Sequence, residues 1–177
     1  MEKPIYLIPV GAVEEVVLEA IARAVERIFN RPCGVGESLA DPAYAYDRPR
    51  RQYRVDEILL RLRRMDMPQA HRLLGLVDRD CYTPGLNFVF GQAVAGGRDA
   101  VVALPRLRQK FYGLPKDEVL FQERATKEAV HELGHTYGLG HCPDSRCVMH
   151  FSNSLADTDI KGATFCERCR AELDLGG

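Results

Sequence analysis

The strongest constraint on how this chain can fold is one predicted helix that carries candidate metal ligands. His131, Glu132 and His135 lie in a predicted helix over 115–137, where residues four positions apart share one face. Both imidazoles can therefore hold the same ion. Gly138 can take a left-handed conformation that ends the helix, so that the chain turns back and delivers His141 from another direction. Three protein ligands with an open fourth position are typical of a catalytic zinc site.

Glu132 lies beside the histidine face of this helix, not opposite to it. A carboxylate in that place reaches a metal-bound water without being a ligand, which suits a general base. The alternative is a set of three histidines on a polar surface. That alternative has to explain why four of the five histidines fall between positions 131 and 150. We therefore favour the metal site.

Four cysteines form a second candidate metal site. They fall in two closely spaced pairs behind the histidines, Cys142 with Cys147 and Cys166 with Cys169. Two such pairs of thiolates are the ligand set of a closed, structural zinc site. The alternative is two disulfides, which a reducing compartment disfavours.

The N-terminal segment indicates which compartment to expect. Residues 5–10 form a short apolar run that contains a proline and is soon followed by two glutamates. A secretory signal needs a positive start and a longer apolar core. We interpret this run as a buried first strand and place the protein in the cytoplasm, where thiols stay reduced. Cys33 and Cys81 have no histidine or cysteine nearby in sequence, so we expect them to pack in the core.

The composition is that of an ordinary globular chain. Its 177 residues are 46% hydrophobic and 28% charged, which suffices for one domain with a substantial core. A net charge of −1 gives no global electrostatic basis for binding nucleic acid or an anionic membrane. Arginines cluster between positions 48 and 64 beside three tyrosines, and we interpret that cluster as a solvated loop and helix face. No apolar run approaches the roughly 18 residues that span a bilayer.

Hydrophobic periodicity predicts strands alternating with helices in the first half of the chain. Such alternation favours a largely parallel sheet covered by helices. The last forty residues are rich in turns apart from one short helix. The expected strands are 5–10, 33–35, 72–77, 87–94 and 100–104. The expected helices are 14–29, 55–65, 115–137 and 166–173.

Together these motifs resemble the archaemetzincins, compact members of the metzincin clan of zinc peptidases. The resemblance is carried by residues 131–169, which contain the histidine motif, both cysteine pairs and Met149, two positions after Cys147. It implies an α+β, zincin-like fold: a mixed β-sheet packed on helices, an active-site helix and a small zinc-stabilised C-terminal subdomain. Residues 1–177 would then form one domain, with a sheet-and-helix part over 1–137 and the Met-turn and cysteines over 138–177.

The resemblance also implies roles for individual residues. Two zinc ions per chain are implied, one catalytic and one structural, held respectively by His131, His135, His141 and by Cys142, Cys147, Cys166, Cys169. Met149 matches the methionine that lies beneath the histidine ligands, and segment 87–94 matches the edge strand along which an extended peptide docks. Astacin-like metzincins have a tyrosine two residues after the methionine. Here that residue is Phe151, so Glu132 has to transfer protons, as general base and acid, without help from a tyrosine.

Two functions of different classes fit these residues. The first is a zinc-dependent metallopeptidase that acts as a monomer on peptides or proteins, through a zinc-bound water and Glu132 as the base. The second is a zinc-stabilised binding module on the same fold, catalytically weak or latent. The intact Glu132 favours the first, since a scaffold has no use for a carboxylate beside the metal. We expect neither nucleic acid nor a membrane as a partner.

Overall fold

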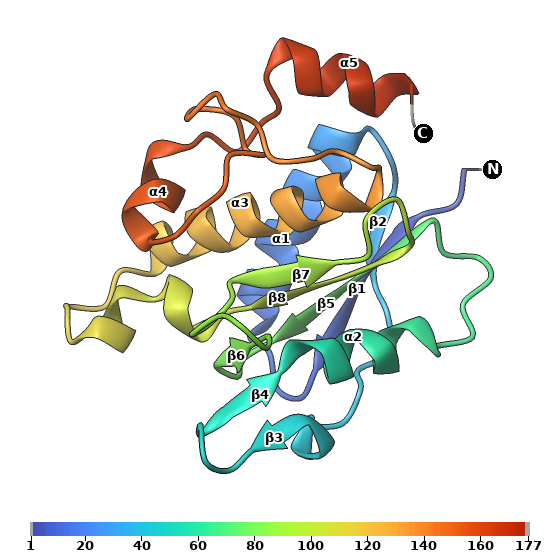
Figure 1. The fold of residues 1–177 in the computed structure, drawn as a ribbon. Helices are drawn as coiled ribbons and strands as arrows, with labels where there is room; N and C mark the ends of the chain where they lie inside the picture. The colour runs from blue at the N-terminus through green and yellow to red at the C-terminus, as the bar shows by residue number, and fades with distance from the viewer. Residues whose placement is uncertain (1, 176–177) are drawn as a thin grey trace.

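The computed structural model describes residues 2–175, which form two sheets flanked by helices (Figure 1). The larger sheet contains, in spatial order, β2 (Cys33–Val35), β1 (Ile5–Val10), β5 (Arg72–Val77), β8 (Asp99–Ala103) and β7 (Gly91–Ala93). The first four strands run parallel, whereas β7 pairs antiparallel with β8. β7 is therefore an edge strand, with one side free of pairing within this sheet.

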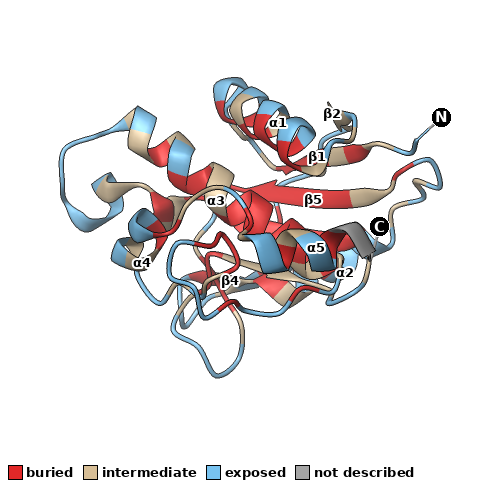
Figure 2. Ribbon diagram, turned by 90° about the horizontal axis from the view of Figure 1, so that it is seen from above, coloured by how far each residue is buried: buried red, intermediate tan, exposed pale blue. Residues whose placement is uncertain are grey.

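Helices cover both faces of the larger sheet. α1 (Glu15–Phe29) and α3 (Glu118–Thr136) lie on one face, and α2 (Val55–Arg63) lies on the other (Figure 1). Side chains of β1 alternate between the two layers, with Leu7 packed toward α1 and α3 and Ile8 packed toward α2. Because both faces are covered, the central strands are buried at nearly every position, as the mostly red ribbon of β5 shows in Figure 2.

A smaller sheet lies beside α2 and was not expected from the sequence. It contains β3 (Tyr46–Asp47), β4 (Gln52–Arg54) and β6 (Cys81–Tyr82), in that order. Strands of two or three residues are too short to show a period of two, so this region was expected to be irregular. Tyr46 and Tyr53 face each other across β3 and β4, with ring centroids 5.0 Å apart.

The C-terminal part packs on the outer side of α1 and α3. It contains α4 (Leu155–Ile160) and α5 (Glu167–Leu175), and its apolar residues form a third cluster with α1 and with Val130 of α3. Three 3₁₀ helices complete the fold: η1 (Ala43–Ala45), η2 (Pro105–Leu107) and η3 (Gln109–Tyr112). None of the helices in residues 2–175 has both the length and the apolar character needed to cross a membrane.

The structure shortens two of the expected elements and adds a helix. The strand expected over 87–94 pairs with β8 only at Gly91–Ala93, since the residues before it leave the sheet and line a cleft. α3 begins at Glu118 and not at 115, because the Asp117 side chain accepts a hydrogen bond from the Leu120 amide and caps the helix. α4 was not expected, although Ser154 and Asp157 form a capping box that marks its start.

Candidate active site

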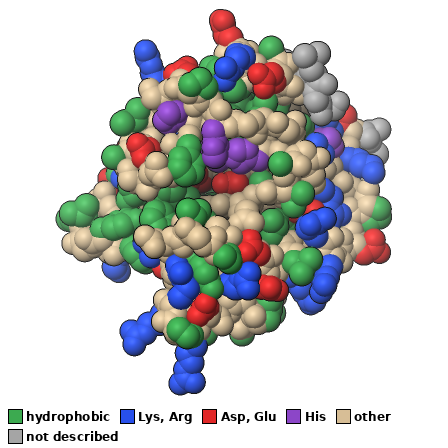
Figure 3. Space-filling model, in the orientation of Figure 1, with side chains coloured by type: hydrophobic (Ala, Val, Ile, Leu, Met, Phe, Trp, Pro, Cys, Tyr) green, Lys and Arg blue, Asp and Glu red, His purple; other side chains and the backbone are tan. Residues whose placement is uncertain are grey.

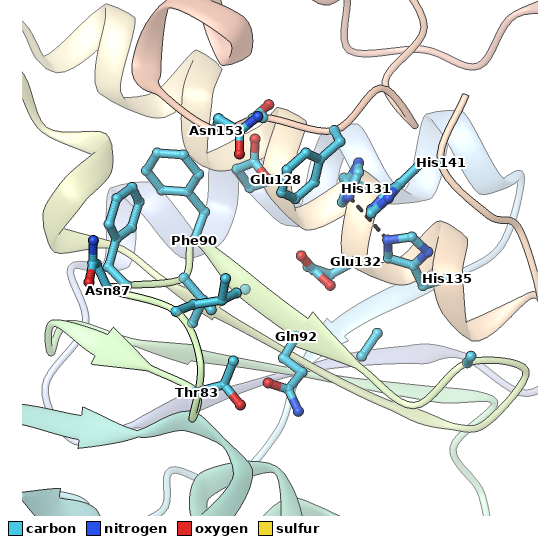
Figure 4. A pocket seen from close by; sticks show the side chains of 18 residues that line it. Thr83, Asn87, Phe90, Gln92, Glu128, His131, Glu132, His135, His141 and Asn153 are labelled. Carbon is cyan, nitrogen blue, oxygen red and sulfur yellow. Dashed lines mark hydrogen bonds between the residues drawn. The ribbon is translucent and has the colours of Figure 1, made fainter. Parts of the chain in front are cut away.

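The histidines of α3 are oriented so that both can bind one cation. Nδ1 of His131 lies 2.8 Å from the Val148 carbonyl oxygen, and Nδ1 of His135 lies 2.7 Å from that of Leu139. A carbonyl oxygen only accepts hydrogen bonds, so each Nδ1 carries the proton and each Nε2 presents a lone pair. The two Nε2 atoms are 3.1 Å apart (Figure 4). Lone pairs facing each other at this distance repel unless a cation lies between them.

That separation fits zinc. Two nitrogens bound to one tetrahedral zinc at about 2.0–2.1 Å are separated by roughly 3.3–3.4 Å. The chain turns at Gly138, with φ of 89°, and brings a nitrogen of His141 to within 4.8 Å of those of both other histidines. Burial lowers the pKa of all three imidazoles, which leaves them neutral and able to bind a metal near neutral pH.

Glu132 lies beneath the three histidines at the bottom of the cleft (Figure 4). Its side chain is almost fully buried, and this burial, reinforced by the nearby Glu128 carboxylate, raises its pKa well above the usual value. A carboxylate with a raised pKa is a better proton acceptor at neutral pH. Glu132 and all three histidines line the same cleft.

Gly91 of β7 makes room for the Glu132 side chain. A Cβ atom at position 91 would lie 2.6 Å from Cγ and 2.7 Å from Oε1 of Glu132, and 2.7 Å from the Val101 carbonyl oxygen. A Cβ atom essentially never comes this close to another heavy atom. The edge strand and the carboxylate therefore approach each other as closely as they do only because residue 91 has no side chain.

We predict that Gly91→Ala displaces Glu132 and lowers peptide cleavage by at least about tenfold, because a shift of about 1 Å at a catalytic group can cost about 100-fold. The zinc content should be unchanged, since no proposed ligand touches position 91. Gly140→Ala is the matched control: a Cβ there meets nothing within 4 Å. Steady-state kinetics and metal analysis of both variants test this. Equal activity of the two variants would contradict the prediction.

A buried ion pair that sequence reasoning missed lies next to Glu132. Lys161, at the end of α4, is fully buried, and its Nζ lies 3.0 Å from Oε1 of Glu128. Nζ also lies 3.3 Å from the His150 carbonyl oxygen, and 3.5 Å from Nδ1 of His131, which already donates to Val148. Glu128 shares a helix face with Glu132 four positions later, a spacing visible in the sequence. Nothing local marks Lys161 as its partner.

Met149 packs against α3 at Gly134. It is fully buried, and a Cβ at Gly134 would overlap its sulfur, so only glycine at position 134 lets the methionine pack against the helix. The neighbouring His150 turns away from the histidine group, and its Nδ1 lies 2.9 Å from the Cys142 carbonyl oxygen.

The four expected cysteines form one compact group. All are free thiols, and their Sγ atoms lie within 4.8 Å of one another, with Cys142 and Cys166 at 3.8 Å. Two thiolates on one tetrahedral zinc at about 2.3 Å are separated by roughly 3.8 Å, so the group fits a closed zinc site better than two disulfides. A hydrogen bond from the Cys169 amide lowers the pKa of Cys166 to about 7, whereas burial raises that of Cys169 itself.

Among the residues that the structure describes, Cys33 and Cys81 belong to no group of potential metal ligands. Cys81 is fully buried in the core layer next to α2, and Cys33 packs at the edge of the opposite layer. Burial raises the pKa of each thiol to about 12. Both observations agree with the expected packing role.

The cleft above Glu132 has a volume of about 550 Å³. One wall is the chain from residue 86 to β7, the floor is α3, and the other wall is 151–153. Phe151 packs on His141, with ring centroids 4.9 Å apart. Figure 3 shows the histidines gathered in the middle of this face, with hydrophobic side chains beside them.

Comparison with known proteins agrees with this geometry. The model of peptidase family M54 matches residues 12–175. An archaemetzincin of Pyrococcus horikoshii is 50% identical over 141 residues, which cover 78% of this chain and 74% of that protein. An archaemetzincin of Pyrococcus abyssi is 43% identical and covers 96% of this chain and 94% of that protein.

Solved structures show the same fold. The crystal structure of archaemetzincin from Methanopyrus kandleri superposes with a TM-score of 0.85 at 40% identity, covering 98% of this chain and 96% of that one. A zinc-dependent peptidase from Methanocorpusculum labreanum gives a TM-score of 0.86 at 30% identity, covering 96% of this chain and 99% of that one. The expected α+β, zincin-like fold is thereby confirmed. The chain belongs to peptidase family M54, the archaemetzincins, and is a zinc metallopeptidase of that family.

Proposed function

We propose that the chain hydrolyses peptide bonds with a catalytic zinc held by His131, His135 and His141 and with Glu132 as the general base. The observation that carries this is the buried Glu132 carboxylate next to three neutral imidazoles whose nitrogens converge on one point. A zinc ion there supplies Lewis acidity, which polarises the scissile carbonyl and lowers the pKa of water.

Glu132 moves the proton in this mechanism. Its raised pKa lets it take a proton from the attacking water and give it to the leaving amine. Phe151 offers no hydroxyl group near the histidines, so we assign both transfers to Glu132. The hydrogen bonds from Nδ1 to Val148 and Leu139 keep the two imidazoles of α3 in the tautomer that leaves Nε2 free.

We assign substrate positioning to β7. Its unpaired side borders the cleft, and an extended peptide can add to it as a further strand through main-chain hydrogen bonds. Gly91 places that strand directly beside Glu132. The scissile bond of a docked peptide would therefore lie between the base and the histidines.

We assign a second, structural zinc to Cys142, Cys147, Cys166 and Cys169. Cys142 directly follows His141, and its amide donates a hydrogen bond to the Met149 carbonyl oxygen at 2.9 Å. A metal on the cysteines would thus hold the turn that presents the third histidine. Four thiols also require a reducing compartment, which supports the cytoplasm as the site of action.

Digestion of a mixed peptide pool, read by mass spectrometry, tests this function. We expect cleavage by the protein that contains two zinc ions per chain, and loss of cleavage when a chelator removes the histidine-bound ion. Returning zinc should restore it. No cleavage of any peptide at full zinc content would instead support the alternative of a zinc-stabilised binding module.

A further inference from the structure

A second carboxylate borders the cleft. Glu128 lies on α3 one turn before Glu132 and faces the space between Phe90 on one wall and Asn153 on the other (Figure 4). Only 3% of the residue is exposed. The mechanism proposed above assigns this buried charge no role.

The two oxygens of Glu128 have different surroundings. Nζ of Lys161 lies 3.0 Å from Oε1, and the Thr158 hydroxyl donates to the same atom at 3.1 Å. Both partners belong to the C-terminal part, Thr158 in α4 and Lys161 directly after it. Among the described residues Oε2 has no hydrogen-bond partner. Glu128 lines the cleft and its partners bond to Oε1, so Oε2 is the oxygen left for a group bound in the cleft.

The opposite wall also carries an unpartnered polar group. Oγ of Ser152 is buried and has no hydrogen-bond partner within residues 2–175, although Ser152 lines the cleft. A donor on a bound side chain could satisfy Oε2 of Glu128, whereas a carboxylate could not. Buried polar atoms are nearly always paired, so the unpartnered Oγ of Ser152, in the same cleft as Glu128, indicates a ligand.

The direction of β7 decides which part of a substrate meets Glu128. Gly91 lies against Glu132, and the Gly96 amide donates a hydrogen bond to the His135 carbonyl oxygen. The chain from β7 to Gly96 therefore runs in the same direction as α3. Antiparallel pairing is the more stable arrangement of a two-stranded pair. A peptide antiparallel to β7 therefore runs from the His135 side toward Phe90 and Glu128. The residue after the cleaved bond comes to lie over Glu128.

Building on the proposed function, we propose that Glu128 is a specificity-determining residue. Its Oε2 accepts a hydrogen bond from the side chain that follows the cleaved bond. That side chain belongs to the class of hydrogen-bond donors, such as asparagine, glutamine or lysine, and aspartate and glutamate are excluded by charge repulsion. Lys161 and Thr158 act as positioning residues that hold the carboxylate in this orientation.

Matched peptides test this subsite. Asparagine and aspartate have nearly the same shape and differ in charge, so peptides that differ only by this pair after the cleaved bond isolate the effect. We expect the zinc-loaded native protein to cleave the asparagine peptide with a kcat/KM roughly ten times higher or more, because like charges facing each other are strongly disfavoured. In Glu128→Gln the ratio of kcat/KM for the asparagine peptide to kcat/KM for the aspartate peptide should fall to roughly one.

Glu128→Gln leaves Lys161 without a counter-charge and could impair folding, so Glu128→Gln with Lys161→Met is the second variant. It replaces the ion pair by neutral side chains of similar length, and we expect the same ratio of roughly one. Glu123→Gln, on the exposed side of α3, is the control and should keep the native ratio.

The outcomes separate the two proposals. If the native protein cleaves peptides but both variants keep its preference for asparagine, the subsite is wrong and the proposed function stands. If the native protein shows no preference, the subsite is equally wrong. If it cleaves no peptide at full zinc content, the proposed function fails and the subsite fails with it.

Discussion

Glu132→Gln is expected to lower kcat for peptide hydrolysis by about 100- to 10,000-fold, the usual contribution of a general base. Glutamine fills the same space beside Gly91 but cannot accept the proton of the attacking water. The zinc content should stay at two ions per chain, because Glu132 is not among the proposed ligands. Steady-state kinetics on one good peptide, together with metal analysis of the same sample, measure both quantities.

Glu123→Gln again serves as the control for a lost carboxylate on α3, and its kcat should equal that of the native protein. Cleavage that persists in Glu132→Gln at a native rate would show that another group accepts the proton. A loss of zinc in Glu132→Gln would show that the carboxylate belongs to the metal site itself. Either result would revise the mechanism, although family membership would be unaffected.

Lys161→Met is expected to lower the free energy of unfolding by about 3–5 kcal/mol. Methionine fills the space of the lysine stem, but the Glu128 carboxylate is left buried without its counter-charge, and breaking a buried ion pair from one side has a cost of this size. Both side chains are almost completely buried, at 0% and 3% exposure, so solvent screens the pair little. Urea unfolding of the zinc-loaded protein measures the change.

Lys127→Met is the matched control for Lys161→Met. Its ammonium also bonds to the C-terminal part, to the Thr158 carbonyl oxygen at 3.1 Å, but it has no buried counter-charge. We expect a loss of less than about 1 kcal/mol there. Adding Glu128→Gln to Lys161→Met should recover most of the lost stability, since no unpaired charge then remains. A similar loss in Lys127→Met and Lys161→Met would mean that the ion pair contributes little.

The Lys161–Glu128 ion pair is one of several contacts that attach the C-terminal part to α3. Arg124, which is also buried, donates two hydrogen bonds to Asp159: Nε to Oδ1 at 2.6 Å and Nη2 to Oδ2 at 2.7 Å. These contacts hold α4, and with it the chain between Met149 and Lys161, against the helix that carries the histidines. The proposed substrate subsite therefore depends on residues about thirty positions apart in the chain.

The local features of this protein were determined by its sequence alone. β1, β2 and β5 have the boundaries that their apolar patterns predict, and α1 differs by one residue. The grouping of the three histidines and of the four cysteines also followed from spacing. Helical geometry relates positions four apart, a glycine ends the helix, and the short spacing within each cysteine pair suits a shared ion. Each of these signals lies within a few neighbouring residues.

Only the tertiary structure decided which distant residues complete the site. Lys161 meets Glu128, and Gly91 meets Glu132, because the chain returns to α3 from the sheet and from α4. No periodicity records such contacts, since they join residues thirty or more positions apart. The same holds for the small sheet, whose short strands are stable only when paired. Burial at these contacts raises the pKa of Glu132 and keeps Glu128 out of bulk solvent. This burial arises from packing that no local pattern contains.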